Sequence, residues 1–324
     1  MHDFKAIILA GGSGERFWPL STPERPKQFL NVFGGESLIR QAFTRLAGLV
    51  EPKKVFVVTS AALVGATRRE LPELPRSNII GEPMRRDTGA AVALGVAVAG
   101  GGTLGFFPAD QMVGRPKEFR RAVSRAMAAA LRRDTIVTIG VRPTYPATGF
   151  GYVNPVRGTF VEKPDARKAA RYLRQGFLWN AGMFIARSEV FRAAFASHAP
   201  LLLPLTDMHR PTARRLAATY ESLPRISFDY AVMEKLPRVA VVKGDFGWDD
   251  VGSYSAFDEY FPHDSRGNVR EGPCTVVEAD GNICVARSAR ISLLGVKNLV
   301  VVTTPDSVLV ADKSRLTEMK RLFA

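Results

Sequence analysis

Short apolar runs that alternate with longer amphipathic stretches constrain the fold of this 324-residue chain most strongly. The apolar runs are rich in β-branched and aromatic residues: KAIILA (5–10), KVFVVTS (54–60), NIIGEP (78–83), TLGFFPAD (103–110) and TIVTIGV (135–141). Helix-like patterns lie between them, near 37–49, 61–71, 87–100 and 117–132. Continuous apolar strands separated by helices are typical of a parallel sheet covered on both faces. We therefore predict an α/β fold, with a Rossmann-like, mostly parallel mixed sheet and helices on both faces.

The pattern of strand-like and helix-like stretches changes twice further along the chain. After residue 143 the strand-like runs GFGYVNP, GTFVEKP, AGMFIA and VAVVKGDF are less regular, with helix patterns at 165–175, 188–197, 210–222 and 228–236. We expect this region to complete a site on the same sheet. From about 266, short valine-rich strands and frequent turns continue until a terminal helix at 314–323, which predicts a small β-helix-like module. The predicted domains are therefore 1–264 and 265–324.

The charge balance suggests anionic ligands. Lysine and arginine number 45 against 31 acidic residues, for a net charge of +14. The basic residues form scattered pairs on helix-like stretches without interleaved aromatics, so we expect no nucleic-acid partner. No apolar run approaches the roughly 18 residues of a membrane span, so no membrane partner is expected either. The first residues do not resemble a signal peptide, which favours a cytoplasmic protein.

Two cysteines, Cys274 and Cys284, lie in the stretch CTVVEADGNICV. Asp280-Gly281 within it is typical of a two-residue hairpin turn, which would set Cys284 opposite Val277. We therefore expect two free thiols rather than a disulfide or a metal site.

A glycine-rich loop follows the first predicted strand, in IILAGGSGERFWPLSTPERPKQFL (7–30). Its spacing fits neither a Walker A loop nor the full dinucleotide pattern, because Phe17 stands where the third glycine would be. A tight turn is one interpretation. However, ligands bind at the carboxyl ends of strands in such sheets, and glycines let backbone N–H groups approach phosphates. Arg16 and Lys27 add positive charge, so we favour a loop that wraps a triphosphate.

Two aspartates end strand-like runs, Asp110 in FFPAD and Asp250 in DFGWDD. A carboxylate is a hard oxygen ligand of the kind that Mg²⁺ prefers. The pair predicts a Mg²⁺ site, other divalent ions being possible, although each residue alone is also a common cap or turn residue.

These stretches together resemble the sugar-phosphate nucleotidyltransferases, and most closely the mannose-1-phosphate guanylyltransferase family. Beyond the glycine loop, the matching segments occur in the family's order and cover nearly the whole catalytic region: GEP (81–83), FPAD (107–110), TGFGYV (148–153), VEKP (161–164), LWNAGMF (178–184), DYAVMEK (229–235) and GWDDVGS (247–253). The resemblance implies the nucleotidyltransferase fold over 1–264 and a small β-helical module over 265–324.

The resemblance also implies the roles of individual residues. The expected catalytic residues are Arg16, Lys27, Lys163, Asp110 and Asp250, of which Asp110 and Asp250 hold the metal. The expected nucleotide-binding residues are Leu9, Gly11, Gly12, Ser13, Gly14, Glu15, Arg16, Lys27, Glu82, Pro83, Asp87 and Thr88. The expected sugar-phosphate-binding residues are Gly149, Glu162, Lys163, Asn180, Gly182, Asp229 and Tyr230.

The chemistry of Glu82 agrees with a role in reading guanine. Guanine presents N1–H and a 2-amino group along one edge, and one carboxylate can accept both hydrogen bonds. A strand-end salt bridge is the alternative for this residue. Nearby, EPMRRDTGAA (82–91) departs from the family's E-P-x-G-R-N-T-A-P-A at Arg85, Asp87, Gly89 and Ala90. Asp87 beside a nucleotide would need a partner such as Arg85 or Arg86, so base preference is less firmly implied than the reaction class.

The implied reaction transfers GMP from GTP to α-D-mannose 1-phosphate, giving GDP-mannose and pyrophosphate, with a homodimer as the expected assembly. The sugar phosphate oxygen attacks the α-phosphorus in line, and positioning and charge neutralisation supply the catalysis. Alternatives are the same chemistry with another hexose or heptose 1-phosphate or another NTP, and a non-catalytic regulatory relative that binds nucleotide sugars.

Overall fold

The structure is a computed structural model that describes residues 3–12, 14–209 and 211–323. The chain forms two compact units that interleave along the sequence. The first unit holds the residues up to Gly11 together with Ile39–Trp248, and the second holds Gly12–Leu38 together with Asp249–Ala324. The division of the chain at 264/265 remains a prediction.

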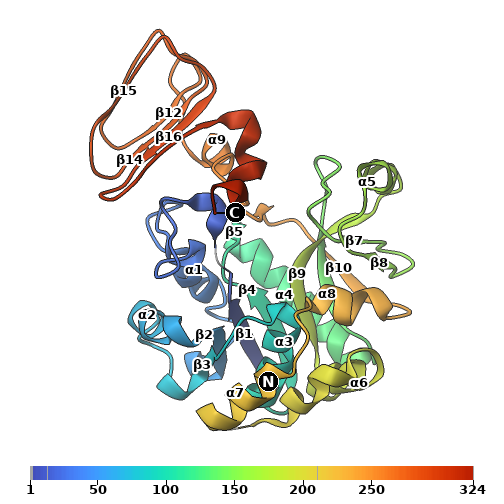
Figure 1. The fold of residues 1–324 in the computed structure, drawn as a ribbon. Helices are drawn as coiled ribbons and strands as arrows, with labels where there is room; N and C mark the ends of the chain where they lie inside the picture. Colours follow the sequence, from blue (N-terminus) through green and yellow to red (C-terminus); the bar gives the residue numbers. More distant parts are fainter. Residues whose placement is uncertain (1–2, 13, 210, 324) are drawn as a thin grey trace. The chain divides into compact units, whose positions relative to one another are not determined.

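A mixed sheet forms the centre of the first unit (Figure 1), and nine of the described strands belong to it. Strands β1, β2, β3 and β4 pair in parallel, as do β6 and β10, whereas β9 runs antiparallel to both β4 and β6. The path β10-β6-β9-β4-β1-β2-β3 therefore confirms the mostly parallel mixed sheet. The strands of this sheet are β1 (Phe4–Ala10), β2 (Val55–Ser60), β3 (Ile79–Glu82), β4 (Thr103–Pro108), β6 (Val137–Val141), β7 (Tyr152–Val153), β8 (Phe160–Val161), β9 (Leu178–Arg187) and β10 (Ala240–Gly244).

Helices flank the sheet along the same stretch of chain. They are α1 (Leu38–Thr44), α2 (Val64–Glu70), α3 (Asp87–Ala99), α4 (Pro116–Arg132), α5 (Ala166–Arg174), α6 (Ser188–His198), α7 (Ala213–Glu221) and α8 (Phe228–Ala231), with the short strands β5 (Met112–Val113) and β11 (Trp248–Asp249). Helix α3 is buried along almost its whole length, as its nearly all-apolar sequence requires. Two predicted helices are shorter than expected, since α1 ends at Thr44 and α8 gives way to a 3-10 turn at Met233–Lys235. The start of the helix predicted at 210 lies outside the described residues.

The end of the second unit is a stack of short strands (Figure 1), as predicted. Strands β12, β14 and β16 pair in parallel, β17 closes that sheet antiparallel to β16, and β13 pairs in parallel with β15. The strands are β12 (Val269–Glu271), β13 (Cys274–Val277), β14 (Ile283–Ala286), β15 (Ile291–Leu294), β16 (Leu299–Thr303) and β17 (Val308–Asp312), with helix α9 (Ala256–Tyr260) before them. The predicted terminal helix is a 3-10 helix, Lys313–Phe323.

The prediction of a hairpin turn at Asp280-Gly281 is wrong. Strands β13 and β14 lie in different sheets, so the segment between them is a corner of the β-helical coil and not a hairpin turn. A coil and a hairpin both require a turn residue at this point, and Gly281, with φ of 67°, serves either. Both cysteines are free thiols, as expected.

Buried asparagines join successive coils of this module. Asn282 donates from its backbone and side-chain nitrogens to the Asn268 Oδ1 atom, at 2.9 Å for each. The Asn282 Oδ1 atom in turn accepts from the Leu299 N–H at 2.9 Å. Both asparagine side chains are fully buried, so each amide replaces water for backbone groups at the coil corners.

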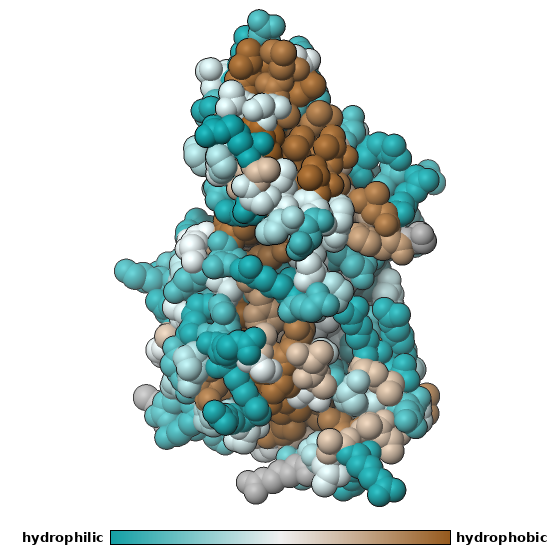
Figure 2. Space-filling view, turned by 60° about the vertical axis from the view of Figure 1, so that its left-hand side comes forward, coloured by the Kyte–Doolittle hydropathy of each residue, from teal (hydrophilic) through white to brown (hydrophobic). Residues whose placement is uncertain are grey.

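Apolar side chains are exposed on the same module, and Figure 2 shows a band of apolar surface there. Val308 and Val310 alternate with buried Leu309 along β17 and are 62% and 63% exposed. Residues two apart on a strand share a face, so the two valines form one outward apolar strip. In the described part of the chain, no helix combines the length and the apolar character needed to cross a bilayer.

We predict that Asn282→Ala lowers the free energy of unfolding of the module by about 1–3 kcal/mol, because it leaves the Leu299 N–H without its partner and removes one of the two hydrogen bonds to the Asn268 Oδ1 atom. Urea unfolding checks this. Ser292→Ala, on the exposed side of β15, is the matched control and should change stability by less than about 0.5 kcal/mol. Equal midpoints for the two variants would contradict the role of the asparagines.

Candidate functional site

The predicted base-reading residue, Glu82, lies at the carboxyl end of β3 and is only 8% exposed. The Tyr220 hydroxyl, from α7, donates to the Glu82 Oε1 atom at 2.9 Å. Burial raises the pKa of Glu82 to about 7, against the lowering effect of that hydrogen bond. A Cβ atom at Gly11 would lie 3.7 Å from the Glu82 Oε2 atom, so the end of β1 borders the same carboxyl group. Among the residues that the structure describes, Glu82 therefore forms no strand-end salt bridge, and it is instead a buried acceptor held by Tyr220.

The segment 85–90, which differs from the family pattern, contains the start of helix α3 at Asp87. Asp87 is exposed, adopts a positive φ of 64° and accepts a hydrogen bond from the Thr88 N–H at 2.7 Å. Arg86, considered above as a partner for Asp87, instead donates to the backbone carbonyls of Tyr220 and Glu221, at 2.8 and 3.1 Å. The Thr88 hydroxyl accepts from the Phe228 N–H at 2.9 Å, which ties the start of α3 to the start of α8.

The predicted sugar-phosphate residues Glu162, Lys163, Asn180, Asp229 and Tyr230 lie close together. The Lys163 Nζ atom is 2.8 Å from the Glu162 Oε1 atom and 5.8 Å from the centre of the Tyr230 ring. The Asn180 Nδ2 atom donates to the Asp229 Oδ1 atom at 3.0 Å. Two strands from the irregular half of the chain, β8 and β9, thus meet the start of α8 in one polar cluster.

Several features hold this cluster in a fixed geometry. The Thr138 hydroxyl, from β6, donates to the Asn180 Oδ1 atom at 2.7 Å, and the Gly182 N–H donates to the same atom at 3.2 Å. A Cβ atom at Gly151 would lie 2.5 Å from the Glu162 Oε2 atom, so a larger residue there would displace that carboxylate from its present position. Lys163 adopts a positive φ of 41°, a strained conformation of the kind that clusters at functional sites.

The two acidic groups of the cluster are difficult to ionise. Burial, and then the charge of Glu162, raises the pKa of Asp229 to about 7. Burial also raises the pKa of Glu162, against the lowering effect of Lys163. Closely placed carboxyl groups with raised pKa values are a feature of binding and catalytic sites.

Asp110 follows β4 in the first unit and is half-buried. Arg45 holds the backbone on both sides of it, donating to the Pro108 carbonyl at 2.9 Å and to the Gln111 carbonyl at 2.8 Å. Burial lowers the pKa of Arg45 to about 10, and the charge of Asp110 opposes that effect. Gln111 continues the network, because it donates to the Ala181 carbonyl and accepts from the Trp248 indole N–H, both at 3.0 Å.

The predicted phosphate loop belongs to the second unit from Gly12 onwards, and so does Asp250. Lys27 is buried, and its Nζ atom donates to the Asp250 carbonyl oxygen at 2.6 Å. Gly14 has φ of 67°, and a Cβ atom there would lie 2.5 Å from the backbone nitrogen of Lys27. The loop therefore approaches Lys27 this closely only with glycine at position 14. A Cβ atom at Gly252 would lie 3.1 Å from the Arg16 Nη1 atom and 3.4 Å from the Asp250 Oδ2 atom. Arg16, Lys27 and Asp250 thus lie around one loop, and their roles there stay a prediction.

The remaining predicted residues are less constrained. Leu9 and Pro83 are half-buried, Gly11, Gly12 and Glu15 are exposed, and the space around Gly149 is open. Ser13 lies outside the described residues. Within 3–12, 14–209 and 211–323, no three His, Cys, Asp or Glu side chains form a metal-binding group. Asp110 and Asp250 nevertheless supply the hard carboxylate oxygens that suit Mg²⁺.

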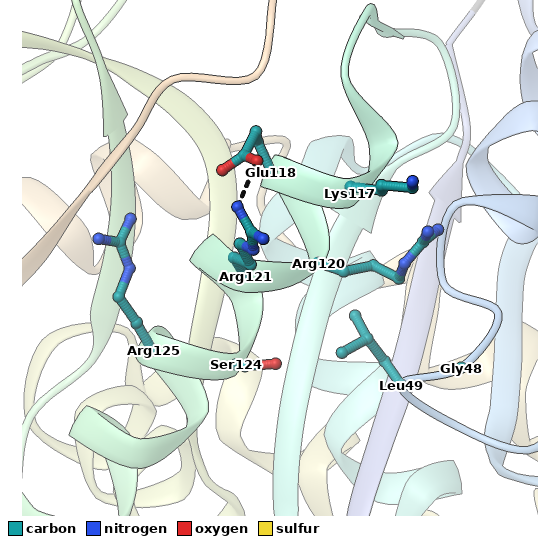
Figure 3. A pocket seen from close by; sticks show the side chains of 8 residues that line it. All are labelled: Gly48, Leu49, Lys117, Glu118, Arg120, Arg121, Ser124 and Arg125. Carbon is teal, nitrogen blue, oxygen red and sulfur yellow. Dashed lines mark hydrogen bonds and ion pairs between the residues drawn. The ribbon is translucent and has the colours of Figure 1, made fainter.

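A basic pocket elsewhere contains none of the predicted residues. Figure 3 shows its lining, where Lys117, Arg120, Arg121 and Arg125 project from α4 and Glu118 pairs with Arg121. Its volume is about 680 Å³. Part of the net positive charge is therefore spread over a helix face that belongs to no predicted subsite.

The sequence patterns did not indicate the residues that hold the predicted ones in place. These are Tyr220 and Arg86 at Glu82, Thr138 at Asn180, and Arg45 and Gln111 beside Asp110. Each is distant in sequence from the group that it supports, or forms no motif with it. A buried polar residue in an otherwise apolar stretch, such as Thr138 in TIVTIGV, is the one signal that was present.

Comparison with known proteins identifies the class. The profile of the nucleotidyl transferase family matches residues 5–266, and that of the mannose phosphate isomerase/GMP-like beta-helix domain matches residues 272–323. A crystal structure described as mannose-1-phosphate geranyltransferase from Thermus thermophilus superposes with a TM-score of 0.89 and 36% sequence identity, covering 99% of this chain and 100% of that one. The chain is thus a nucleotidyltransferase with a C-terminal β-helical module.

Two curated relatives identify the family within the class of nucleotidyltransferases. Mannose-1-phosphate guanylyltransferase of Escherichia coli is 35% identical over 97% of this chain and 72% of its own length. Xanthan biosynthesis protein XanB of Xanthomonas campestris pv. campestris (strain B100) is 35% identical over 100% of this chain and 73% of its own length. The chain belongs to the mannose-1-phosphate guanylyltransferase family, which confirms the resemblance found in the sequence.

We predict that Asp229→Asn flattens the dependence of stability on pH. The folded protein keeps a proton on Asp229 up to a pKa of about 7, whereas the unfolded chain releases it near 3.8. This carboxyl therefore stabilises the fold fully below pH 3.8, and its contribution is lost as the pH rises towards 7. Urea unfolding at pH 5 and pH 7.5 should show a smaller loss of stability in the variant than in the unmodified protein. Asp306→Asn, at an exposed position, should leave the loss unchanged; an equal loss in all three proteins would contradict the assignment.

Proposed function

We propose that this chain transfers GMP from GTP to α-D-mannose 1-phosphate, giving GDP-mannose and pyrophosphate. Membership of the mannose-1-phosphate guanylyltransferase family carries the proposal. The single structural observation that supports it best is the buried Glu82 carboxyl at the end of β3, because a carboxylate can accept both N–H donors of guanine.

In the proposed reaction an oxygen of the sugar phosphate attacks the α-phosphorus of GTP. The new P–O bond forms as the bond to pyrophosphate breaks on the opposite side. A phosphate monoester is largely dianionic near pH 7, since its second pKa is about 6, so no general base is needed. The protein has to position two anions and offset their charge.

The residues divide this work between them. Glu162, Asn180 and Asp229 would bind sugar hydroxyls, and Lys163 would align the sugar phosphate. Arg16 and Lys27 would stabilise charge on the leaving pyrophosphate, with backbone N–H groups of Gly11, Gly12 and Gly14 along the phosphates. Asp110 and Asp250 would hold Mg²⁺, which supplies further charge neutralisation when it is bound. The reaction is proposed to take place in the cytoplasm.

Pyrophosphate release tests the proposal. Purified protein with Mg²⁺ is assayed with GTP, ATP, UTP and dTTP against mannose, glucose and a heptose 1-phosphate. The proposal expects release to be greatest with GTP and mannose 1-phosphate. Greater activity with another pair would support the reaction type and refute the proposed substrates. Residues 85–90, which differ from the family pattern, would then be the first to examine. No release from folded protein would favour the non-catalytic relative.

We predict that Asp110→Asn lowers kcat by at least about 100-fold, because it removes a charge expected to hold the metal beside the reacting phosphates. Circular dichroism should report an unchanged fold. Asp134→Asn, whose side chain is 90% exposed, is the matched control and should retain full turnover. Near-normal turnover in Asp110→Asn would remove this residue from the metal site.

The homodimer is also a proposal, and the exposed strip of Val308 and Val310 supports it. We predict that the double variant Val308→Glu with Val310→Glu is folded but monomeric in light scattering, whereas the unmodified chain is a dimer. The substitutions lie on an exposed strand face, so they should not disturb the core. A monomeric unmodified chain, or a dimer that survives both charges, would contradict this interface.

A further inference from the structure

The chain from Tyr220 to Ile226 packs closely against the segment that carries Glu82. Tyr220 is fully buried near the end of α7, and its hydroxyl reaches the Glu82 Oε1 atom across a separation of 138 residues. A tyrosine hydroxyl that is removed from water needs a partner, and here the partner is the carboxyl group proposed to read the base.

Backbone contacts fix this packing. The Arg86 guanidinium donates to the carbonyl oxygens of Tyr220 and Glu221, at 2.8 and 3.1 Å. In return the Ile226 N–H donates to the Arg86 carbonyl at 3.3 Å, and the Gly89 N–H donates to the Ile226 carbonyl at 3.1 Å. The two segments are therefore joined at both ends of the loop that follows α7.

Gly89 is required for this close approach. A Cβ atom at residue 89 would lie 2.6 Å from the Ile226 carbonyl oxygen and 2.9 Å from a methyl group of Leu202. Both distances are shorter than ordinary van der Waals contact, so an alanine would push the loop away from α3. Gly89 is one of the departures in EPMRRDTGAA, and the structure gives it a physical reason: it admits the segment that carries Tyr220.

The groups that face Glu82 determine its charge. Tyr220 approaches from α7, Asp87 from the start of α3, and Gly11 from its position directly after β1. Burial and the negative charge of Asp87 raise the pKa of Glu82, whereas the hydrogen bond from Tyr220 lowers it, with a result of about 7. The hydroxyl thus favours the ionised carboxylate against the two other influences.

The protonation state of such a carboxyl changes which base it matches. An ionised carboxylate only accepts hydrogen bonds, so it fits the N1–H and 2-amino donors of guanine. A protonated carboxyl donates one hydrogen bond and accepts another, so it fits the N1 acceptor and the 6-amino donor of adenine. Ionisation of Glu82 therefore favours GTP over ATP, and protonation weakens that preference.

We propose that Tyr220 is a positioning residue for base selection: its hydroxyl orients the Glu82 carboxyl and stabilises its ionised form by a hydrogen bond, and Arg86 and Gly89 hold Tyr220 in place. The inference rests on the proposed function, since it assumes that Glu82 reads the base. It goes further because it assigns control over the choice between GTP and ATP to Tyr220, a residue that acts through Glu82 and is not itself proposed to contact the base.

The test compares Tyr220→Phe with the unmodified enzyme, measuring kcat/KM for GTP and for ATP from pH 6 to pH 9. The variant loses only the hydroxyl. We expect the midpoint of the GTP profile to rise by about one pH unit and the GTP/ATP preference at pH 7 to fall about tenfold, because a hydrogen bond to a charged group is lost. An unchanged midpoint with an unchanged preference would overturn the proposal, even if the variant were less stable.

Two further variants isolate the effect. Tyr254→Phe removes another buried hydroxyl, which donates to the Phe17 backbone carbonyl at 2.9 Å, and it should leave the midpoint unmoved. Glu82→Gln has no charge to titrate and should give a flat GTP profile. If Tyr220→Phe does not fold, the unmodified enzyme still decides, because a GTP/ATP preference that is constant from pH 6 to pH 9 overturns the proposal. Absence of GTP activity in the unmodified enzyme would instead refute the proposed function itself.

Discussion

The burial of carboxyl groups is the physical constraint on which the proposed site depends. Glu82 and Asp229 are withdrawn from water far enough that their pKa values rise to about 7, and each keeps its place through hydrogen bonds from other elements. A solvated carboxylate would bind water as readily as a sugar hydroxyl or a base. A desolvated, oriented carboxylate offers its acceptors to a ligand with little reorganisation, at a cost in stability that the surrounding sheet and helices offset.

The proposed role of the second unit sets the opposite requirement, which is to present positive charge to phosphates. Lys27 is buried, and its ammonium group is directed at the Asp250 carbonyl oxygen. The loop around it needs Gly14 in a left-handed conformation. Fixed cations and a compact glycine loop suit a polyphosphate better than mobile surface lysines do, because less side-chain freedom is lost when the ligand binds. The net charge of the chain matters less here, since part of it lies on the exposed face of α4.

The sequence was sufficient for the fold class, because continuous apolar strands alternating with helix patterns specify a covered parallel sheet. It also indicated the groups of residues that the structure brings together, through motifs that surround each strand end. It could not distinguish the coil corner at Gly281 from a hairpin, since both need the same turn chemistry. Nor could it find Tyr220 or the true partners of Arg86, because hydrogen bonds across 138 and 134 residues leave no local pattern.

The role of Glu82 can be measured most directly by a carbon-13 NMR titration of the glutamate carboxyl groups, with the Glu82 signal assigned by its loss in Glu82→Gln. We expect Glu82 to titrate near pH 7 in the free protein, because the carboxyl is buried. We also expect saturating GTP to lower the midpoint, since guanine donates hydrogen bonds to the ionised form. A midpoint at the ordinary 4.5 would contradict the effect of burial on this carboxyl, and a midpoint that GTP does not move would show that Glu82 does not read the base.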